Sequence, residues 1–248
     1  MKSKHKDKVM NKIYIIFLSI FLTISSQADL FSKGLQGSGV AKKEKRNVTG
    51  AKYIVNDSPA KIIVKMGNNE ELYVEGDDNL INIVNTYVKN NCLTVSIADV
   101  SFSTKQPLTV YVTTNELTGL KVKGCGDIVS SGKINSNKIT LLVDGSGDIQ
   151  IANLLSDMLT LAIMGSGDIK IAGQAKQLTA EIMGSGDIDA RMMKAQMANI
   201  LVKGSGDCLV NTSNQAIVKI VGSGDVQLFG KPPVIKQYVS GSGVIRTY

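Results

Sequence analysis

The stretch Gly145-Ser146-Gly147-Asp148-Ile149 contains the four-residue motif Gly-Ser-Gly-Asp, which recurs through the second half of this 248-residue chain. Further copies begin at Gly124 (with cysteine in second place), Gly165, Gly184, Gly204 and Gly222, and an acid-free copy begins at Gly241. The fourth positions of successive copies lie 21, 20, 19, 20, 18 and 19 residues apart. A period near 20 residues indicates one structural unit that is repeated by stacking.

The residues around each copy alternate between apolar and variable. In the copy at Gly145 the apolar positions are Leu141 and Val143 before the motif and Ile149 and Ile151 after it. The other copies follow the same pattern. Alternation with a period of two predicts strands with one buried face on both sides of a tight corner. Two short strands, a corner and a connection fill about 20 residues, the length of one β-helical coil. The sequence therefore predicts an all-β fold, a right-handed parallel β-helix solenoid with coils of about 20 residues.

The chain divides into three parts. Residues 1–28 have five lysines, an apolar run and a small-x-small ending, which is the layout of a secretory signal peptide. Residues 29–116 read as an irregular N-terminal cap or irregular first coils, with one short helix predicted near residues 79–88. Residues 117–248 hold the regular repeats and form one continuous domain with 29–116. After cleavage of the signal peptide we expect no membrane span, and the mature chain is exported to the periplasm, the outer surface or the medium.

The charge of the mature chain is modest. The signal peptide holds five of the 28 Lys and Arg residues and one of the 21 Asp and Glu residues, so the remainder has a net charge of +3. Aromatic residues are scarce and tryptophan is absent. With no basic patch interleaved with aromatics, nucleic-acid binding has no support.

Several segments resemble one known family. They are Gly37-Ser38-Gly39-Val40, Arg46-x-Val48-x-Gly50, Val74-Glu75-Gly76-Asp77-Asp78-Asn79-Leu80 and the Gly-Ser-Gly-Asp series. Together they are similar to the putative autotransporter adhesin, head GIN domain family, over essentially the whole mature chain. The resemblance implies a β-helical protein that is secreted or held in the cell envelope of Bacteroidota. It implies no catalytic residues, because none are established for the family.

The residue types exclude several chemistries. The one histidine, His5, lies in the predicted signal peptide, so the mature chain has no Ser-His-acid or Cys-His catalysis and no histidine metal site. Cys92, Cys125 and Cys208 are too few for a closed zinc site, and we expect small, buried or half-buried thiols. A disulfide between Cys92 and Cys125 is left open.

The repeated aspartates are the sharpest chemical feature. They are Asp127, Asp148, Asp168, Asp187, Asp207 and Asp225, and stacking places them along one edge. The interpretation that we favour is structural, with each acid and serine hydrogen-bonded to freed corner amides. A ladder of bound calcium ions ranks second, because calcium needs six to eight oxygens. A catalytic carboxylate pair ranks last, since a regular ladder marks no particular pair.

The corner glycines are expected to supply backbone angles that are closed to other residues. They are Gly145, Gly147, Gly165, Gly167, Gly184, Gly186, Gly204, Gly206, Gly222 and Gly224. We assign no catalytic residue, no cofactor and no metal site, with calcium on the aspartates as the single alternative.

The function predicted from the sequence is a non-catalytic exported protein of the cell envelope or surface, an adhesin or binding scaffold. A glycan or a surface protein is the expected partner. A β-helical polysaccharide lyase or hydrolase and a periplasmic protein of envelope sensing or assembly are the alternatives. Because the terminal strands of a solenoid have open edges, a homodimer is also left open.

Overall fold

A computed structural model describes residues 34–248 of the chain, so the predicted signal peptide at 1–28 lies outside the described residues. The described chain forms two units. The small one contains the parallel strand pair β1 (Leu35–Gln36) and β8 (Phe102–Ser103). The large one comprises Gly37–Ala98 and Thr104–Tyr248 and carries all other strands. Within residues 34–248 no helix has the length and apolar character to cross a membrane.

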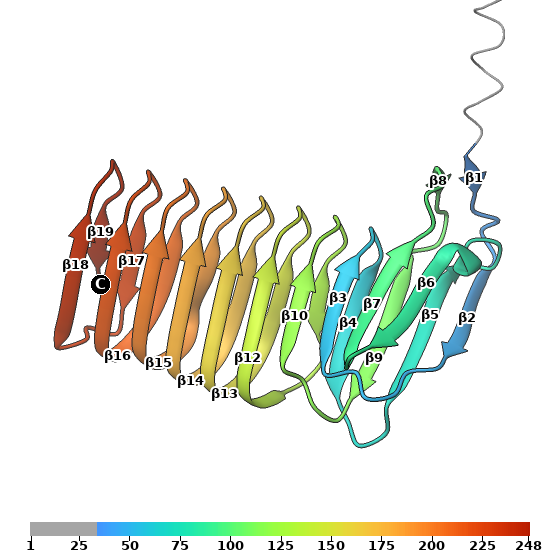
Figure 1. The fold of residues 1–248 in the computed structure, drawn as a ribbon, viewed down its shortest axis with the longest axis horizontal. Helices are drawn as coiled ribbons and strands as arrows, with labels where there is room; N and C mark the ends of the chain where they lie inside the picture. The colour runs from blue at the N-terminus through green and yellow to red at the C-terminus, as the bar shows by residue number, and fades with distance from the viewer. Residues whose placement is uncertain (1–33) are drawn as a thin grey trace, which may run out of the picture. The chain divides into compact units, whose positions relative to one another are not determined.

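The large unit is a β-solenoid of about six turns, which confirms the fold class predicted from the repeat (Figure 1). Each coil has a strand segment before the Gly-Ser-Gly-Asp corner and one after it, and equivalent segments pair in parallel. The strands are β10 (Gly119–Val122), β11 (Ile128–Ser130), β12 (Ile134–Val143), β13 (Ile149–Ile163), β14 (Ile169–Ile182), β15 (Ile188–Val202), β16 (Cys208–Ile220), β17 (Val226–Phe229), β18 (Val234–Val239) and β19 (Ile245–Thr247). We name the sheet before the corners the A face and the sheet after them the B face.

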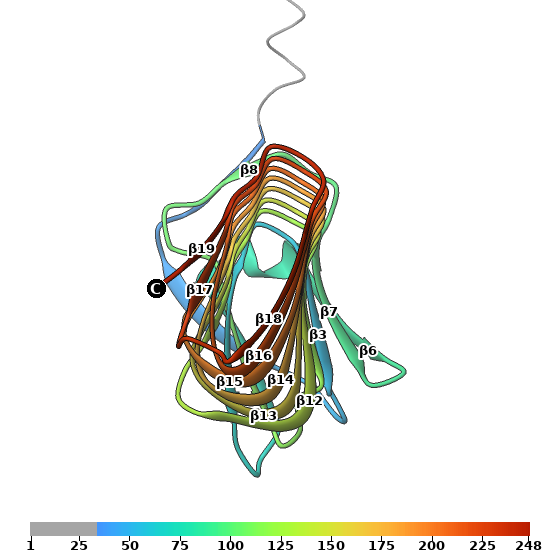
Figure 2. The ribbon, with the colours of Figure 1, turned by 90° about the vertical axis from the view of Figure 1, so that its left-hand side faces the viewer.

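The regular strands are longer than the sequence suggests. Strands β13 to β16 have 13 to 15 residues each, because every one continues from one corner, around a curved side, to the next corner. The register shifts on the curved side, for example between Ile151 and Leu154. Each coil is therefore closed by one tight corner and one smooth bend, as the end-on view in Figure 2 shows.

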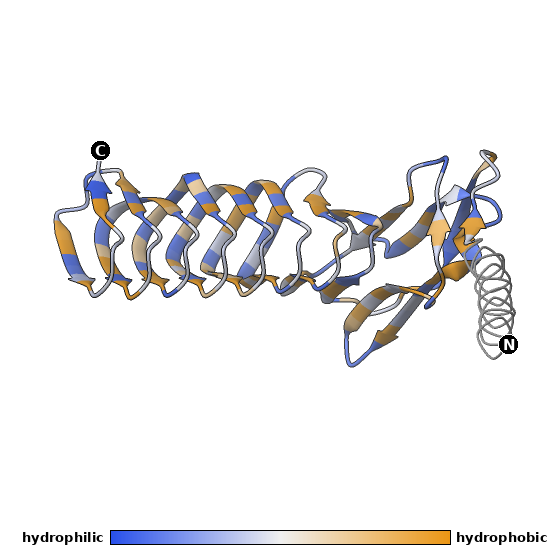
Figure 3. Cartoon of the chain, turned by 90° about the horizontal axis from the view of Figure 1, so that it is seen from above, coloured by the Kyte–Doolittle hydropathy of each residue, from blue (hydrophilic) through white to orange (hydrophobic). Residues whose placement is uncertain are grey.

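The core is a set of stacked aliphatic rows that lie inside the coils. On the B face one row joins Ile128, Ile149, Ile169, Ile188, Cys208 and Val226, all with no exposed area. The hydropathy bands of Figure 3 alternate along each strand, as period-two alternation requires. Burial of each isoleucine contributes about 1.5–3 kcal/mol.

The N-terminal strands extend both faces. Strand β3 (Tyr53–Asp57) pairs in parallel with β10 and β7 (Cys92–Ile97) on the A face, and β4 (Lys61–Met66) pairs in parallel with β11 and β9 (Thr109–Thr114) on the B face. The corner between β3 and β4 has no glycine. There the buried Asn56 amide donates to the carbonyl oxygens of Ala60 (2.8 Å) and Gly126 (2.9 Å), which anchors this coil to the first glycine corner.

The end of the core is closed by antiparallel strands. Strand β5 (Glu71–Asp77) pairs with β9 and with β2 (Ala41–Arg46), and β6 (Val84–Lys89) pairs with β7. The short 3-10 helix η2 (Ile81–Ile83) joins β5 to β6, and in Figure 2 it lies across the lumen of the coils. The guanidinium of Arg46 donates to the carbonyl oxygens of Ile81 (3.1 Å) and Val84 (3.3 Å). Of the short helix predicted near residues 79–88, only the 3-10 turn Ile81–Ile83 is present, and the rest of the prediction is wrong because Val84–Lys89 pairs as an edge strand.

Candidate functional site

The repeated aspartates form a hydrogen-bonded ladder between coils. The Oδ1 atom of each acid accepts a hydrogen bond from the backbone N–H at the equivalent position of the next coil, at 2.7–3.0 Å. The donors are Asp148, Asp168, Asp187, Asp207, Asp225 and finally Val244, and the acceptors are Asp127, Asp148, Asp168, Asp187, Asp207 and Asp225. The acids therefore bind the amide of the following corner rather than amides of their own corner.

The last acid of the ladder has a second partner. The Arg246 guanidinium lies 2.6 Å from Oδ2 of Asp225, and this contact, together with the Val244 N–H, lowers the pKa of Asp225. Among residues 34–248 no three His, Cys, Asp or Glu side chains converge as a metal site would require. The ladder can join coils, and a calcium site on it stays a prediction.

The corner glycines serve close stacking. None of the ten belongs to the glycines with positive φ in the described part of the chain, so the expectation of special backbone angles is wrong. A Cβ atom on Gly167 would instead overlap the carbonyl oxygen of Gly147 in the preceding coil, and the other corners repeat this contact. The close approach lets the Ser166 N–H donate to the Gly145 carbonyl at 3.0 Å.

The three cysteines are free. Cys125 is exposed at a corner, Cys92 is half-buried and Cys208 is buried in the B-face row. Burial raises the pKa of the Cys208 thiol far above its ordinary value. The pairing of Cys92 with Cys125 that the sequence left open is absent from the described chain.

The outward side of the B face carries a row of side chains that the repeat does not dictate. In register order it includes Tyr73, Tyr111, Ile63, Val129, Gln150, Lys170 and Asp189. This part has two tyrosines, then two aliphatic residues and then polar residues, and pairing extends the row to Lys45 beside Tyr73 and to Leu209 beside Asp189. We name the part from Tyr73 to Lys170, with the two hollows beside it, the B-face strip.

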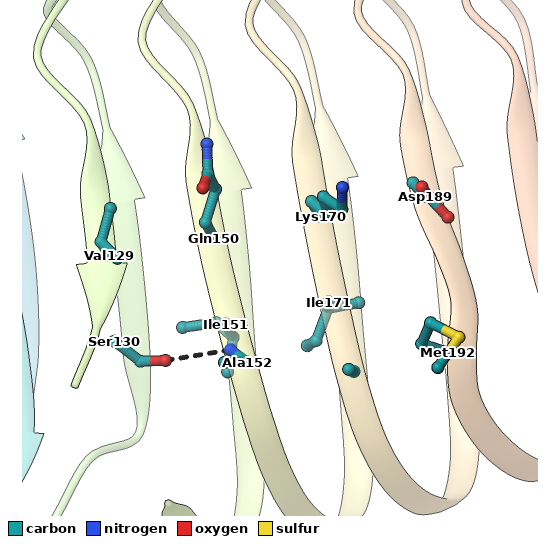
Figure 4. Close-up of a pocket in the computed structure, with 10 residues that line it drawn as sticks. Val129, Ser130, Gln150, Ile151, Ala152, Lys170, Ile171, Asp189 and Met192 are labelled. Carbon is teal, nitrogen blue, oxygen red and sulfur yellow. Dashed lines mark hydrogen bonds between the residues drawn. The ribbon is translucent and has the colours of Figure 1, made fainter. Parts of the chain in front are cut away.

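An apolar notch of about 210 Å³ lies at one end of the B-face strip. Figure 4 shows its walls, with Val129, Ile151, Ile171 and Met192 contributed by four successive coils. The notch exists because the small residues Ala152 and Ala172 stand where the register shifts. At its rim the Met192 side chain is 73% exposed, and an unbranched methionine can adapt its shape to a ligand.

The polar rim of the notch is held in place by local contacts. The Ser130 hydroxyl oxygen accepts a hydrogen bond of 3.1 Å from the Ala152 N–H (Figure 4). Asp189 is paired with Arg191 through contacts of 2.9 and 2.7 Å, which lower the pKa of Asp189. Lys170 lies next to Asp189 in register and forms no direct ion pair within residues 34–248, but its charge also lowers the pKa of Asp189.

A second hollow, of about 370 Å³, lies at the aromatic end of the B-face strip. Its lining includes Tyr73, Tyr111, Ile63, Lys43 and Lys65. The ammonium group of Lys43 lies 3.8 Å from the centre of the Tyr111 ring, a cation–π contact. Burial, followed by the neighbouring Glu75, raises the pKa of Tyr111.

The acids beside this hollow form ion pairs, whereas one of its lysines does not. Glu75 lies 3.2 Å from Lys43, and Glu71 lies 3.5 Å from Lys45. Lys65 has no ion-pair partner in the described chain. The hollow therefore presents a free ammonium group beside apolar surface.

Sequence reasoning located the corners and missed the B-face strip. The acids and glycines of the repeat can be recognised by their period. Tyr73, Tyr111 and Ile63 come instead from three irregular strands, which meet through one antiparallel and one parallel pairing. The weak signal that was available is the alternation of Tyr73 with Leu72 and Val74, which marks an outward aromatic residue.

Structures of similar fold have been solved for other bacterial proteins. One, a putative adhesin from Bacteroides fragilis, has a TM-score of 0.83 and 23% identity, with 87% of this chain and 100% of that chain covered. A putative lipid binding protein from Parabacteroides distasonis has a TM-score of 0.70 and 21% identity over 86% and 99% of the two chains. A putative adhesin from Parabacteroides merdae has a TM-score of 0.68 and 19% identity over 86% and 98%. At these identities the likeness shows the fold.

No curated protein matches the chain. A family model, described as putative auto-transporter adhesin, head GIN domain, matches residues 52–232. This range covers strands β3 to β9, including the antiparallel strands β5 and β6, and most of the regular repeats. The chain therefore belongs to the putative auto-transporter adhesin, head GIN domain family.

Proposed function

We propose that this protein is an exported, non-catalytic binding scaffold of the cell envelope or surface, an adhesin that contacts its partner through the B face. The observation that carries the proposal is the B-face strip, an outward band with two hollows on a rigid stack of coils. Family membership and the predicted signal peptide support it. Solenoids use such extended surfaces for binding.

The aspartate ladder supports a non-catalytic role. Glycoside hydrolysis needs two carboxyl groups that face each other across a gap of about 5–9 Å. Here every acid of the series has one oxygen bound to the next coil, and Asp225 has in addition an ion pair with Arg246, so the series repeats one contact and marks no complementary pair of acids.

The first experiment is protease treatment of intact cells, with lysed cells and a periplasmic marker protein as controls. We expect the protein to be cleaved on intact cells while the marker survives. Protection until lysis would contradict surface exposure and would favour the periplasmic alternative.

The second experiment tests the face. Cells with Val129→Glu on the B face are compared with cells with Leu142→Glu on the A face for attachment to glycan-coated and protein-coated surfaces. Both positions are half-buried and point outward on neighbouring coils, so each variant controls for the other. We expect Val129→Glu to reduce attachment and Leu142→Glu to leave it unchanged. Equal attachment of both variants and the unmodified strain would refute binding through the B face.

A further inference from the structure

We infer that the B-face strip binds a single-chain anionic amphiphile, with its tail in the apolar notch and along Val129 and Ile63 and its anionic group at a strip lysine. The inference rests on the proposed use of the B face and names the ligand class for it. Dimensions, polarity and charge each support it.

The strip has the length of an acyl chain. Strands β9, β4, β11, β13 and β14 are consecutive neighbours on the B face, so four strand spacings separate Tyr111 from Lys170. At about 4.8 Å per spacing the strip spans roughly 19 Å. One leaflet of a bilayer core, which holds one acyl chain end to end, is about 15 Å thick.

The two hollows form one apolar path. Val129 lines the notch, Ile63 lines the aromatic hollow, and the two residues are opposite each other in register. The notch is larger than the roughly 150 Å³ that suffices to hold a benzene molecule in an apolar cavity. A tail can therefore leave the notch and continue over the aliphatic side chains of Val129 and Ile63.

The charges of the strip favour an anion. The acids beside it are neutralised within the protein: Asp189 by Arg191, Glu71 by Lys45 and Glu75 by Lys43. The ammonium groups of Lys65, in the aromatic hollow, and Lys170, in the notch, have no such partner in residues 34–248. One lysine without a direct ion pair therefore stands at each end of the apolar path, with Lys170 also acting through space on the neighbouring Asp189, and a phosphate or carboxylate head group would pair with either.

Calorimetric titration of the full chain tests the inference. The probe is lysophosphatidylglycerol with a 14-carbon chain, below its micelle concentration. Lysophosphatidylcholine of the same chain length tests the charge, and glycerol phosphate tests the head group without a tail. We expect lysophosphatidylglycerol to bind up to about fivefold more tightly than lysophosphatidylcholine, since one exposed charge pair contributes up to about 1 kcal/mol. We expect no binding of glycerol phosphate. Equal binding of the two lipids, or none, would overturn the inference.

Matched variants locate the site. Ala152→Leu fills the notch, and Ala162→Leu makes the same change at an outward position of the A face. We expect the first to weaken binding at least tenfold and the second to leave it unchanged. The Lys65→Gln, Lys170→Gln double variant should remove the preference for the anionic lipid while it retains tail binding. Equal effects of the two alanine variants would place the lipid elsewhere and contradict the assignment.

Methyl NMR tests the site in the unmodified protein, so the result does not depend on whether any variant folds. On addition of the lipid, the Met192 methyl signal at the notch should shift, while those of Met164 and Met183, exposed next to the corners, should stay in place. Shifts at Met164 and Met183 with none at Met192 would refute the site. Because surface exposure is measured separately by protease treatment, a protein that is exposed and binds no amphiphile would refute this inference and leave the proposed function standing.

Discussion

The Oδ1 atom of Asp225 accepts a 2.8 Å hydrogen bond from the backbone N–H of Val244, which joins the last acid of the ladder to the one corner that has no acid. The relationship explains why the final copy of the repeat can carry valine. Each acid accepts a hydrogen bond from the coil after it, and Val244 supplies that hydrogen bond with its backbone N–H, which needs no acidic side chain.

The ladder makes a first prediction about stability. Asp168→Ala removes the acceptor of the Asp187 N–H and should lower the free energy of unfolding by about 1–3 kcal/mol. Asp168→Asn keeps a side-chain oxygen and should lose less. Urea unfolding followed by circular dichroism measures both. Asp157→Ala on the curved side, where an exposed ion pair with Lys176 is lost, is the control and should cost less than about 1 kcal/mol. An Asp168→Ala effect no larger than this control would contradict the ladder.

Close stacking at the corners makes a second prediction. Gly167→Ala places a methyl group against the Gly147 carbonyl and should destabilise the protein by about 1–3 kcal/mol or more, because the backbone must shift. In a chain of this size that corresponds to a fall in Tm of several degrees, about 2–4 °C per kcal/mol. Ser166→Ala at the exposed neighbouring position is the control. If both variants have the same Tm as the unmodified protein, the corners tolerate a Cβ atom and the stacking argument fails.

The buried acid Asp77 makes a third prediction, about pH. Its carboxylate has no exposed area and accepts hydrogen bonds from the backbone N–H groups of Gly39 (2.6 Å), Lys105 (2.9 Å) and Gln106 (3.0 Å). Burial opposes ionisation, but these three donors outweigh it and lower the pKa of Asp77 below its ordinary 3.8. The resulting stability is complete above that ordinary value and is lost as pH falls through the lowered pKa of the folded protein.

Asp77→Asn measures this contribution. We expect the variant to be less stable than the unmodified protein at pH 6 and the difference to shrink as the pH falls below about 4. Urea titrations at several pH values give the comparison. A difference that is constant with pH, or that grows in acid, would show that the carboxylate is not ionised in the folded state.

The cysteines make a fourth prediction. The exposed Cys125 should react with a thiol reagent in the native protein, whereas Cys208, buried in the B-face row, should react after unfolding in urea. Burial raises the pKa of Cys208 and so removes its reactive thiolate at neutral pH. Mass spectrometry of labelled peptides distinguishes the sites, and Cys125→Ser identifies the fast signal. Native labelling of Cys208 at the rate of Cys125 would contradict the burial of this row.

Much of the fold follows from the repeat, and the reason is physical. A fixed period with apolar residues two apart has few solutions other than stacked strands with an inner row, so Ile128, Ile149 and Ile169 could be placed next to one another from their numbers. The segment that follows Asn79 could not be assigned in this way. Its weak periodicity suits a helix as well as a strand, and pairing of Val84–Lys89 with Cys92–Ile97 decides between them.

The sequence by itself determined the all-β class, the coil length, the inward rows and the alignment of six aspartates, because all four depend on spacing along the chain. Tertiary structure decided what the corner residues do: the glycines allow adjacent coils to approach, and the acids bind the next coil, which are contacts between residues about 20 positions apart. The tertiary structure also decided which residues form the B-face strip. Tyr73, Tyr111, Ile63 and Val129 become neighbours through antiparallel and parallel pairing of strands that are not consecutive in the chain.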